Sequence, residues 1–447
     1  MRFLKKTLKV FLFLAIIVLV LMLLLLKPVN RSPLEENAYF KTTLNNLKAL
    51  QLQHTEGKQW YAGWDAQNVT PAEPVDLVGF RPRGNYDFVL DSSFVKSMVI
   101  SNGKANVAFL SYQLMIIHPA LSQSIREAVQ EANLPIDHLY FTASHTHSGY
   151  GGHMKGLLSK VMYGGYDTSI VKLLVKKSLI ALKNSIHKSD SVEIKYFKAD
   201  AESLVRNRFI SKDPVDPFVR QLHLEKKDGS RALLFSFSAH ATTLSSDFMG
   251  LSGDYPHFLE QELQNNQDYE LAIFAAGTVG SHSPIIPAKS EQTTIDYAKD
   301  LAERIFEHSD TIIAQNSATL SFGSLNIALE EPHLRVSDNY RLKPALFEFL
   351  IGHSRASMDI LRLGDLLFLS SSAEVSGVFY HQWEELANQY GLELMLTTFN
   401  GNYIGYAPPD QYYHKHYRES RELNWYGPHT GSYYDTLVKS AILKVGN

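Results

Sequence analysis

The chain reads His138-Leu-Tyr-Phe-Thr-Ala-Ser-His-Thr-His-Ser-Gly149 in the first half of its 447 residues. The apolar first half of this stretch predicts a β-strand, and the glycines at and just beyond its end indicate that the strand stops near the histidines. Histidines two apart on a regular strand point to the same face, whereas a strand that is ending separates them. We therefore expect one of His145 and His147 to bind a metal ion and the other to face a substrate. Ordinary hydrogen-bonded histidines are the alternative.

Polar residues follow other apolar strands in the same way. Two such strands end at His240 and Glu374, and a later turn rich in glycine and proline carries Tyr403 and Tyr406. Active sites of open α/β sheets lie at the carboxyl ends of strands. Two histidines, a carboxylate and a tyrosine at one edge would form a metal site with a position left for water.

Short β-type runs alternate with helical patterns along the rest of the chain, and we expect an amphipathic helix over residues 35–58. The predicted strands are 94–100, 105–110, 138–143, 232–237, 271–275 and 366–370, and the predicted helices are 121–133, 169–186, 256–265, 293–308 and 379–390. This interleaving predicts an α/β fold, with β-sheets flanked by helices. No repeat or linker divides the chain, so we expect a single large domain.

The composition limits the chemistry. With 45% hydrophobic and 20% charged residues the chain can bury a large core. A net charge of −3 does not produce the positive electrostatic potential that nucleic-acid binding requires. There is no cysteine, so a thiolate zinc site and a cysteine nucleophile are excluded, and His, Asp, Glu or another oxygen ligand must hold any metal.

The N-terminus predicts a membrane anchor. Basic residues from Arg2 to Lys9 precede an apolar run from Val10 to Leu26, which reaches the roughly 17 residues at which the membrane-spanning range begins. No small-residue cleavage site follows, so we expect residues 1–31 to be a cytoplasmic stub and a retained signal-anchor transmembrane helix. The basic flank predicts a cytoplasmic N-terminus and places residues 32–447 outside the cytoplasm, in the periplasm or the extracellular space.

Taken together, the motifs resemble those of the neutral (alkaline, non-lysosomal) ceramidases, in their N-terminal catalytic domain. They occur in the family's order and span nearly the whole chain after the anchor. The matching segments are 69–71, 78–80, 144–149, 238–242, 252–254, 373–375, 402–406 and 426–430.

The resemblance implies one zinc ion and a set of site residues. Its ligands would be His145, His240, Glu374 and Tyr406, and His147 would assist the chemistry as the second histidine of its motif. Arg208 would contact the substrate. Local pattern alone leaves Tyr403, His257, His282 and His429 open as other ligands, and leaves Glu374 open as a helix N-terminal acid.

Other parts of the chain depart from the family's pattern. The family's active-site serine matches Ser283, which precedes a proline, although Ser281 is a second candidate because the motif has extra residues. Gln113 stands where many relatives have an acidic residue, which puts the orientation of a metal ligand in question. The β-rich C-terminal domain of the larger members is expected to be absent.

These observations predict a zinc-dependent amidohydrolase that cleaves a ceramide-like lipid to a fatty acid and a sphingoid base. The partners would be a lipid or small-molecule N-acyl amide and a membrane, with no nucleic acid. Two alternatives are a hydrolase of a different amide or ester on the same scaffold, and a membrane-tethered binding protein without turnover.

Overall fold

The structure is a computed structural model, and it describes residues 2–307, 313–314, 317–352 and 354–447. A large mixed sheet of nine strands forms its centre. In spatial order eight of them are β13 (Tyr269–Ala276), β11 (Arg231–Phe237), β10 (Phe218–Lys226), β8 (Asp190–Asp200), β3 (Trp60–Asn68), β5 (Phe94–Ser101), β6 (Asn106–Tyr112) and β7 (His138–Ala143). The ninth, β15 (Ile313–Ala314), pairs with β8.

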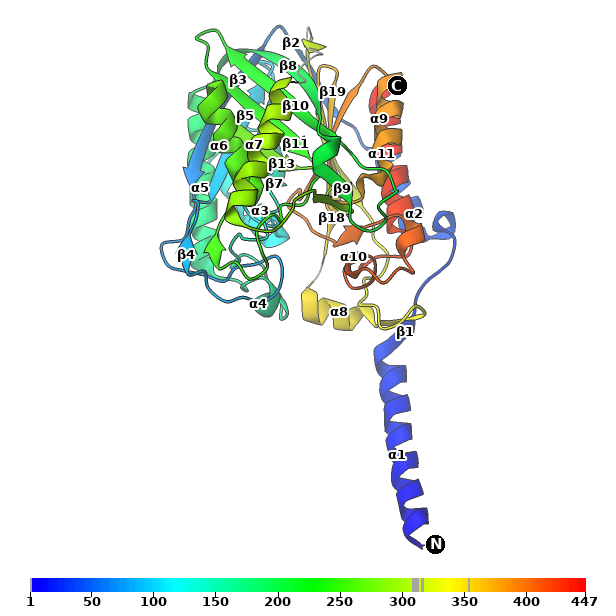
Figure 1. Cartoon of the computed structure of the whole chain (residues 1–447). Coiled ribbons are helices and arrows are strands. Elements are labelled where there is room, and N and C mark those ends of the chain that lie inside the picture. The colour runs from blue at the N-terminus through cyan, green and yellow to red at the C-terminus, as the bar shows by residue number, and fades with distance from the viewer. Residues whose placement is uncertain (1, 308–312, 315–316, 353) are drawn as a thin grey trace.

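A second sheet of five strands packs face to face against the large one (Figure 1). Its order is β2 (Gln53–Gly57), β16 (Ala318–Ile327), β18 (Ala356–Leu363), β19 (Leu366–Ser371) and β21 (Glu393–Thr398). Phe109 of the large sheet and Phe368 of the small one meet between them, with ring centroids 5.1 Å apart. Val107 and Phe109 point into this inter-sheet core, while Ala108 and Leu110 point into the core beneath the helices. Both faces of β6 are therefore buried, which explains its nearly continuous apolar sequence.

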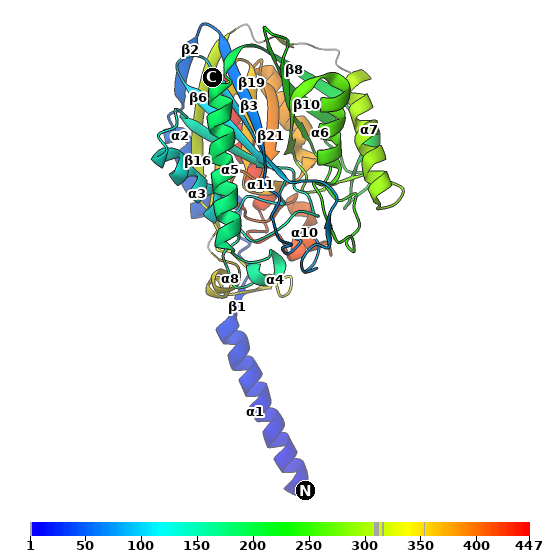
Figure 2. The ribbon, with the colours of Figure 1, turned by 90° about the vertical axis from the view of Figure 1, so that its left-hand side faces the viewer.

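Helices cover the outer faces of both sheets, giving four layers (Figures 1 and 2). Those over the large sheet are α3 (Pro119–Glu131), α5 (Thr168–His187), α6 (Asp254–Gln267) and α7 (Glu291–Glu307). Those over the small sheet are α2 (Ala38–Ala49), α9 (Tyr380–Gln389) and α11 (Thr430–Gly446). The predicted α/β architecture of one domain with flanked sheets is confirmed, and the predicted strands and helices match to within a few residues. His308, the last residue of one predicted helix, lies outside the described residues.

Two predictions near the N-terminus need correction. The helix expected over 35–58 ends at Ala49, and Gln53–Gly57 instead forms β2, which pairs with β16 and so gains an edge position in the small sheet. At the start of the chain, α1 (Arg2–Leu25) projects from the domain and leads into β1 (Leu26–Pro28). Among the residues that the structure describes, no helix combines the length and apolar character needed to cross a bilayer, so the predicted transmembrane helix is not confirmed.

Candidate metal centre

Strand ends bring the predicted site residues together. His145 and His147 follow β7, and His240 follows β11. Glu374 begins β20 (Glu374–Val375), which pairs in parallel with β22 (Tyr406–Ala407), so that Glu374 and Tyr406 are direct partners in register. Residues separated by more than 250 positions thus converge at one edge, because parallel strands deliver their carboxyl ends to the same side of a sheet.

Three imidazole nitrogens face a common point. Nε2 of His145 lies 3.0 Å from Nε2 of His240 and 3.3 Å from Nε2 of His147. The facing nitrogens of all three rings lie within 4.8 Å of one another. Oε2 of Glu374 lies 3.4 Å from Nε2 of both His145 and His240. This group could hold a metal ion.

Backbone carbonyls fix the tautomers of two of the histidines. Nδ1 of His145 lies 2.7 Å from the Met115 carbonyl, and Nδ1 of His240 lies 2.8 Å from the Val279 carbonyl. A carbonyl oxygen only accepts, so each Nδ1 carries the hydrogen, and in the neutral form of each ring the lone pair is at Nε2. Two lone pairs 3.0 Å apart repel unless a cation lies between them. This arrangement, with the far nitrogen held by an acceptor, is typical of metal-binding histidines.

His147 differs from the other two. Its Nδ1 is buried and has no hydrogen-bond partner among the described residues. Burial, with His145 and Arg208 nearby, lowers the pKa of His147 well below its usual value, so the ring is neutral near pH 7. The ring packs beside Phe80, and Gly79 makes this possible because a Cβ there would lie 2.6 Å from Cα of His147. His147 is thus a neutral imidazole whose tautomer is not fixed by a carbonyl.

Glu374 is held ionised in spite of its burial. Burial alone would raise the pKa of Glu374, but His145 and the hydroxyls of Tyr403 and Tyr406 lower it below its usual value. Tyr403 donates to Oε1 at 2.6 Å, whereas Oε2 has no conventional hydrogen-bond donor. One carboxylate oxygen is therefore fixed by the tyrosine, and the other faces the histidine nitrogens.

The two tyrosines have separate places. Oη of Tyr406 lies 3.3 Å from Nε2 of His240, whereas Tyr403 contacts the carboxylate from behind. Arg208 donates to Oη of Tyr406 at 3.4 Å and pairs with Glu419 at 3.2 Å. Of the two tyrosines, Tyr406 is the one beside the histidine nitrogens, and Arg208 lies next to it.

A cavity of about 430 Å³ opens in front of these groups. His145, His147, Glu374 and both tyrosines line it, together with cationic side chains at its walls. Those cations are Arg81, Arg208, Lys289 and Arg418. The cavity thus offers several donors to a substrate oxygen that gains negative charge.

The serine candidates lie outside this cavity. Ser283 is on β14 (His282–Pro284) opposite Arg206 of β9 (Val205–Asn207), whose Nε donates to its hydroxyl at 3.4 Å. Ser281 is buried, and its hydroxyl lies 2.8 Å from Nδ1 of His282 and 2.7 Å from Oγ of Ser376. Ser283 does not line the cavity, and its hydroxyl contacts Arg206 instead. Ser281 instead supports the site indirectly, because its carbonyl accepts from the backbone N–H of Arg208 at 2.9 Å.

The other histidine candidates are engaged elsewhere. His282 accepts at Nε2 from the backbone N–H of Asp216 at 2.8 Å, and His429 lies 3.3 Å from Asp410. His257 lies beside Gln113, whose amide is 3.1 Å from Nδ1 of the ring. Each of these three histidines therefore has a partner away from the group formed by His145, His147 and His240.

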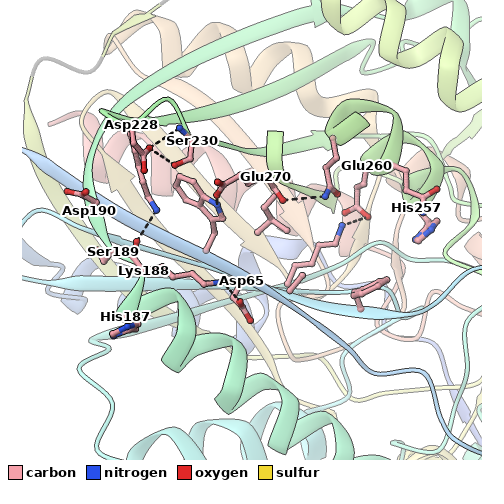
Figure 3. A pocket seen from close by; sticks show the side chains of 18 residues that line it. Asp65, His187, Lys188, Ser189, Asp190, Asp228, Ser230, His257, Glu260 and Glu270 are labelled. Carbon is pink, nitrogen blue, oxygen red and sulfur yellow. Dashed lines mark hydrogen bonds and ion pairs between the residues drawn. The ribbon is translucent and has the colours of Figure 1, made fainter. Parts of the chain in front are cut away.

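A second and larger cavity, of about 830 Å³, lies away from the metal centre (Figure 3). Its charged walls pair with one another: Lys96 with Glu260 at 2.7 Å, and Lys188 with Asp65 at 2.7 Å. Gln113, the departure noted in the sequence, donates to Glu260 at 2.7 Å. An acidic residue at 113 would place a second charge against Glu260, so the amide fits this buried pair.

An aromatic side chain that was not predicted from the sequence also contacts the histidine group. Phe399 stacks on the ring of His145, with centroids 4.2 Å apart and planes at 14°. Both residues have positive φ, 60° for His145 and 67° for Phe399, a conformation that costs about 1–2 kcal/mol per residue. Strain of this kind collects at functional sites. The sequence shows only an apolar residue before Asn400-Gly401 at a strand end, which carries no specific signal.

Comparison with solved structures finds the same fold in neutral ceramidase from Pseudomonas aeruginosa. That match has a TM-score of 0.72 and 14% identity, and it covers 87% of this chain and 75% of the ceramidase chain. A ceramidase complexed with C2 matches with a TM-score of 0.71 and 14% identity, covering 86% of this chain and 75% of that one. Comparison with protein-family models gives no match, and comparison with curated proteins gives none either. The chain has the fold of neutral ceramidase at low sequence identity.

Proposed function

We propose that this chain is a zinc-dependent amidohydrolase that cleaves the N-acyl amide bond of a ceramide-like lipid, giving a fatty acid and a sphingoid base. The observation that carries the proposal is the approach of two Nε2 lone pairs, of His145 and His240, each fixed by a carbonyl behind its ring. The likeness in fold to a neutral ceramidase supports the substrate class.

The donor set fits zinc. Ligands 2.0–2.1 Å from a tetrahedral zinc lie about 3.3 Å from one another. The distances from Nε2 of His240 to His145, Glu374 and Tyr406 are 3.0, 3.4 and 3.3 Å. Histidine nitrogens and carboxylate oxygens are typical ligands of catalytic zinc sites. We assign His145, His240, Glu374 and Tyr406 as the ligands.

Zinc held there would supply an activated water and polarise the scissile carbonyl. His147, free of a carbonyl at Nδ1 and neutral near pH 7, accepts a proton and returns it to the departing amine. Arg208, beside Tyr406, donates to the oxygen on which negative charge develops. Glu419 holds the guanidinium in place.

Substrate turnover tests the proposal. Wild type, His240→Ala and Ser283→Ala are given ceramides, N-acyl amino acids and carboxylic esters. Hydrolysis of ceramides by wild type and Ser283→Ala, lost in His240→Ala, is the expected result. Preference for another amide or for an ester would contradict the proposed substrate class but not the proposed metal site. No turnover of any substrate would favour a binding protein. The location outside the cytoplasm stays a prediction.

A further inference from the structure

One end of the domain gathers its exposed apolar side chains. Outside α1, eleven large apolar side chains are exposed among the described residues, and the four most exposed are Phe349 at 68%, Val161 at 59%, Leu157 at 57% and Val336 at 52%. All four belong to a set around α4 (Ser159–Met162) and α8 (Pro344–Ile351) that we name the α4–α8 patch. The patch consists of Leu157, Val161, Tyr166, Val336, Tyr340 and Phe349.

A backbone hydrogen bond joins the two helices of this patch. The N–H of Leu158, just before α4, donates to the carbonyl of Leu350 in α8 at 2.8 Å. β17 (Tyr340–Leu342), which carries Tyr340, leads directly into α8. Figures 1 and 2 both show α4 and α8 side by side at one end of the domain. Exposed apolar side chains gathered at one end of a domain mark an interaction site.

The N-terminal helix leaves the domain at the same end. β1 pairs with β17, and the N–H of Lys343, just before α8, donates to the carbonyl of Leu25 at 2.9 Å. α1 exposes large apolar side chains along its length, among them Phe11 and Phe13. Two apolar surfaces therefore adjoin, one on the projecting helix and one on the domain.

Behind the patch lies an apolar cavity of about 280 Å³. While Val161 of α4 points outward, Leu158 and Met162 line this cavity, with Ile351 of α8 beside them. Its remaining walls include Met154, Leu334 and Trp425. Met162, Tyr163, Arg418 and Leu423 line both this cavity and the metal cavity. The patch and the metal centre are thus linked by neighbouring cavities that share a wall.

We propose that the α4–α8 patch is the surface with which the domain docks on a lipid bilayer. Lysines border the patch: Lys155 and Lys160 are exposed, and Lys155 lies over the ring of Tyr166. Apolar side chains bordered by lysine are typical of surfaces that lie in the headgroup region, where the amines reach the phosphates. A protein partner would not require an apolar cavity behind the contact. The use of this cavity by substrate chains rests on the proposed function, whereas docking itself does not.

The absence of cysteine makes a direct test possible. Single cysteines are introduced in the full chain as Val161→Cys, Phe349→Cys and, as a control remote from the patch, Leu443→Cys, which is also exposed. Each is labelled with an environment-sensitive dye and mixed with phosphatidylcholine vesicles that contain a minority of phosphatidylglycerol and a lipid-borne quencher. Docking through the patch shifts the emission at 161 and 349 to the blue and quenches it, and leaves 443 unchanged.

Vesicle binding that leaves the dyes at 161 and 349 in a polar, unquenched state would overturn the proposal, as would failure of the full chain to bind vesicles at all. The double variant Val161→Asp/Phe349→Asp should bind vesicles at least about tenfold more weakly. It should still hydrolyse a water-soluble short-chain N-acyl amide at the wild-type rate. If the double variant loses vesicle binding but still hydrolyses the soluble substrate, docking through the patch is supported. If the dyes insert into the vesicles but no substrate is hydrolysed, the amidase proposal is refuted and the docking proposal stands.

Discussion

His145 and His240 place their Nε2 atoms 3.0 Å apart, while a backbone carbonyl holds the Nδ1–H of each ring. A single shared proton could satisfy this pair alone. It could not also satisfy the free oxygen of Glu374, 3.4 Å from both nitrogens, and Nε2 of His147. A metal cation would satisfy the two nitrogens and the carboxylate oxygen at once, with His147 beside it, so this group could hold a metal ion.

Removal of the Tyr403 hydroxyl should weaken metal binding without removing a ligand. Tyr403→Phe leaves Oε1 of Glu374 without its 2.6 Å donor, so the carboxylate loses its orientation. Loss of such a supporting contact costs about 10–100-fold in metal affinity. Competition with a fluorescent chelator measures this change. Tyr406→Phe, which removes a proposed ligand, should weaken affinity by more than Tyr403→Phe; the reverse order would contradict the ligand assignment.

Part of this centre could be predicted from the sequence because His145, His240 and Glu374 each follow an apolar strand. The strands before His145, His240 and Glu374 are buried on both faces, so each is a nearly continuous apolar run that is followed by the polar residue of the site. The α/β class follows from the same alternation of periods two and 3.6. The local pattern also predicted that Tyr403 or Tyr406 would be a metal ligand, although it did not distinguish between the two.

Tertiary contacts decided what the sequence did not predict. Ser283 resembles the family's serine motif because a proline follows it, but antiparallel pairing places it opposite Arg206. The stacking of Phe399 on His145 joins β21 to β7, which belong to different sheets. Residues 53–57 continue a polar helical pattern, yet pairing with β16 makes them a strand. Such pairings between distant segments leave no local signal.

Substitution of Ser281 and of Ser283 should change the free energy of unfolding by different amounts. Ser281→Ala removes a buried hydroxyl that is bonded to His282 and Ser376, and leaving those partners unsatisfied costs about 1–3 kcal/mol. Ser283→Ala removes only a long contact with an exposed arginine and should be neutral within about 0.5 kcal/mol. Urea unfolding of both variants checks this. Equal destabilisation by the two variants would contradict the prediction that the Ser283 hydroxyl contributes little to stability.

Asp91 should make stability fall as the pH rises. Burial raises the pKa of Asp91 to about 7, although Ser252 and the N–H of Gly253 favour its charged form. The folded state therefore keeps the Asp91 proton at pH values where the unfolded state has released it. The stability that this proton contributes is fully present below about pH 4 and is lost as the pH rises to about 7. Asp91→Asn removes it. Urea unfolding at pH 5 and pH 8 should show a smaller decrease for the variant than for wild type; an equal decrease would argue against a raised pKa.

Zinc removal should lower the melting temperature reversibly. A ligand that binds only the folded state stabilises it by about 2.7 kcal/mol when its free concentration is 100 times its Kd. Chelator treatment of the full chain should therefore lower the Tm, and added zinc should restore it. The same treatment should leave the Tm of His145→Ala unchanged. A shift of equal size in that variant would place the metal elsewhere.

The most direct test of the metal centre is elemental analysis of the purified full chain beside two histidine variants. Wild type should carry about one zinc per chain. His240→Ala should lose it, while His381→Ala, a control whose side chain is 73% exposed, should retain it. Circular dichroism establishes that all three are folded. A folded wild type that takes up no zinc, or a His240→Ala variant that keeps it, would contradict the account.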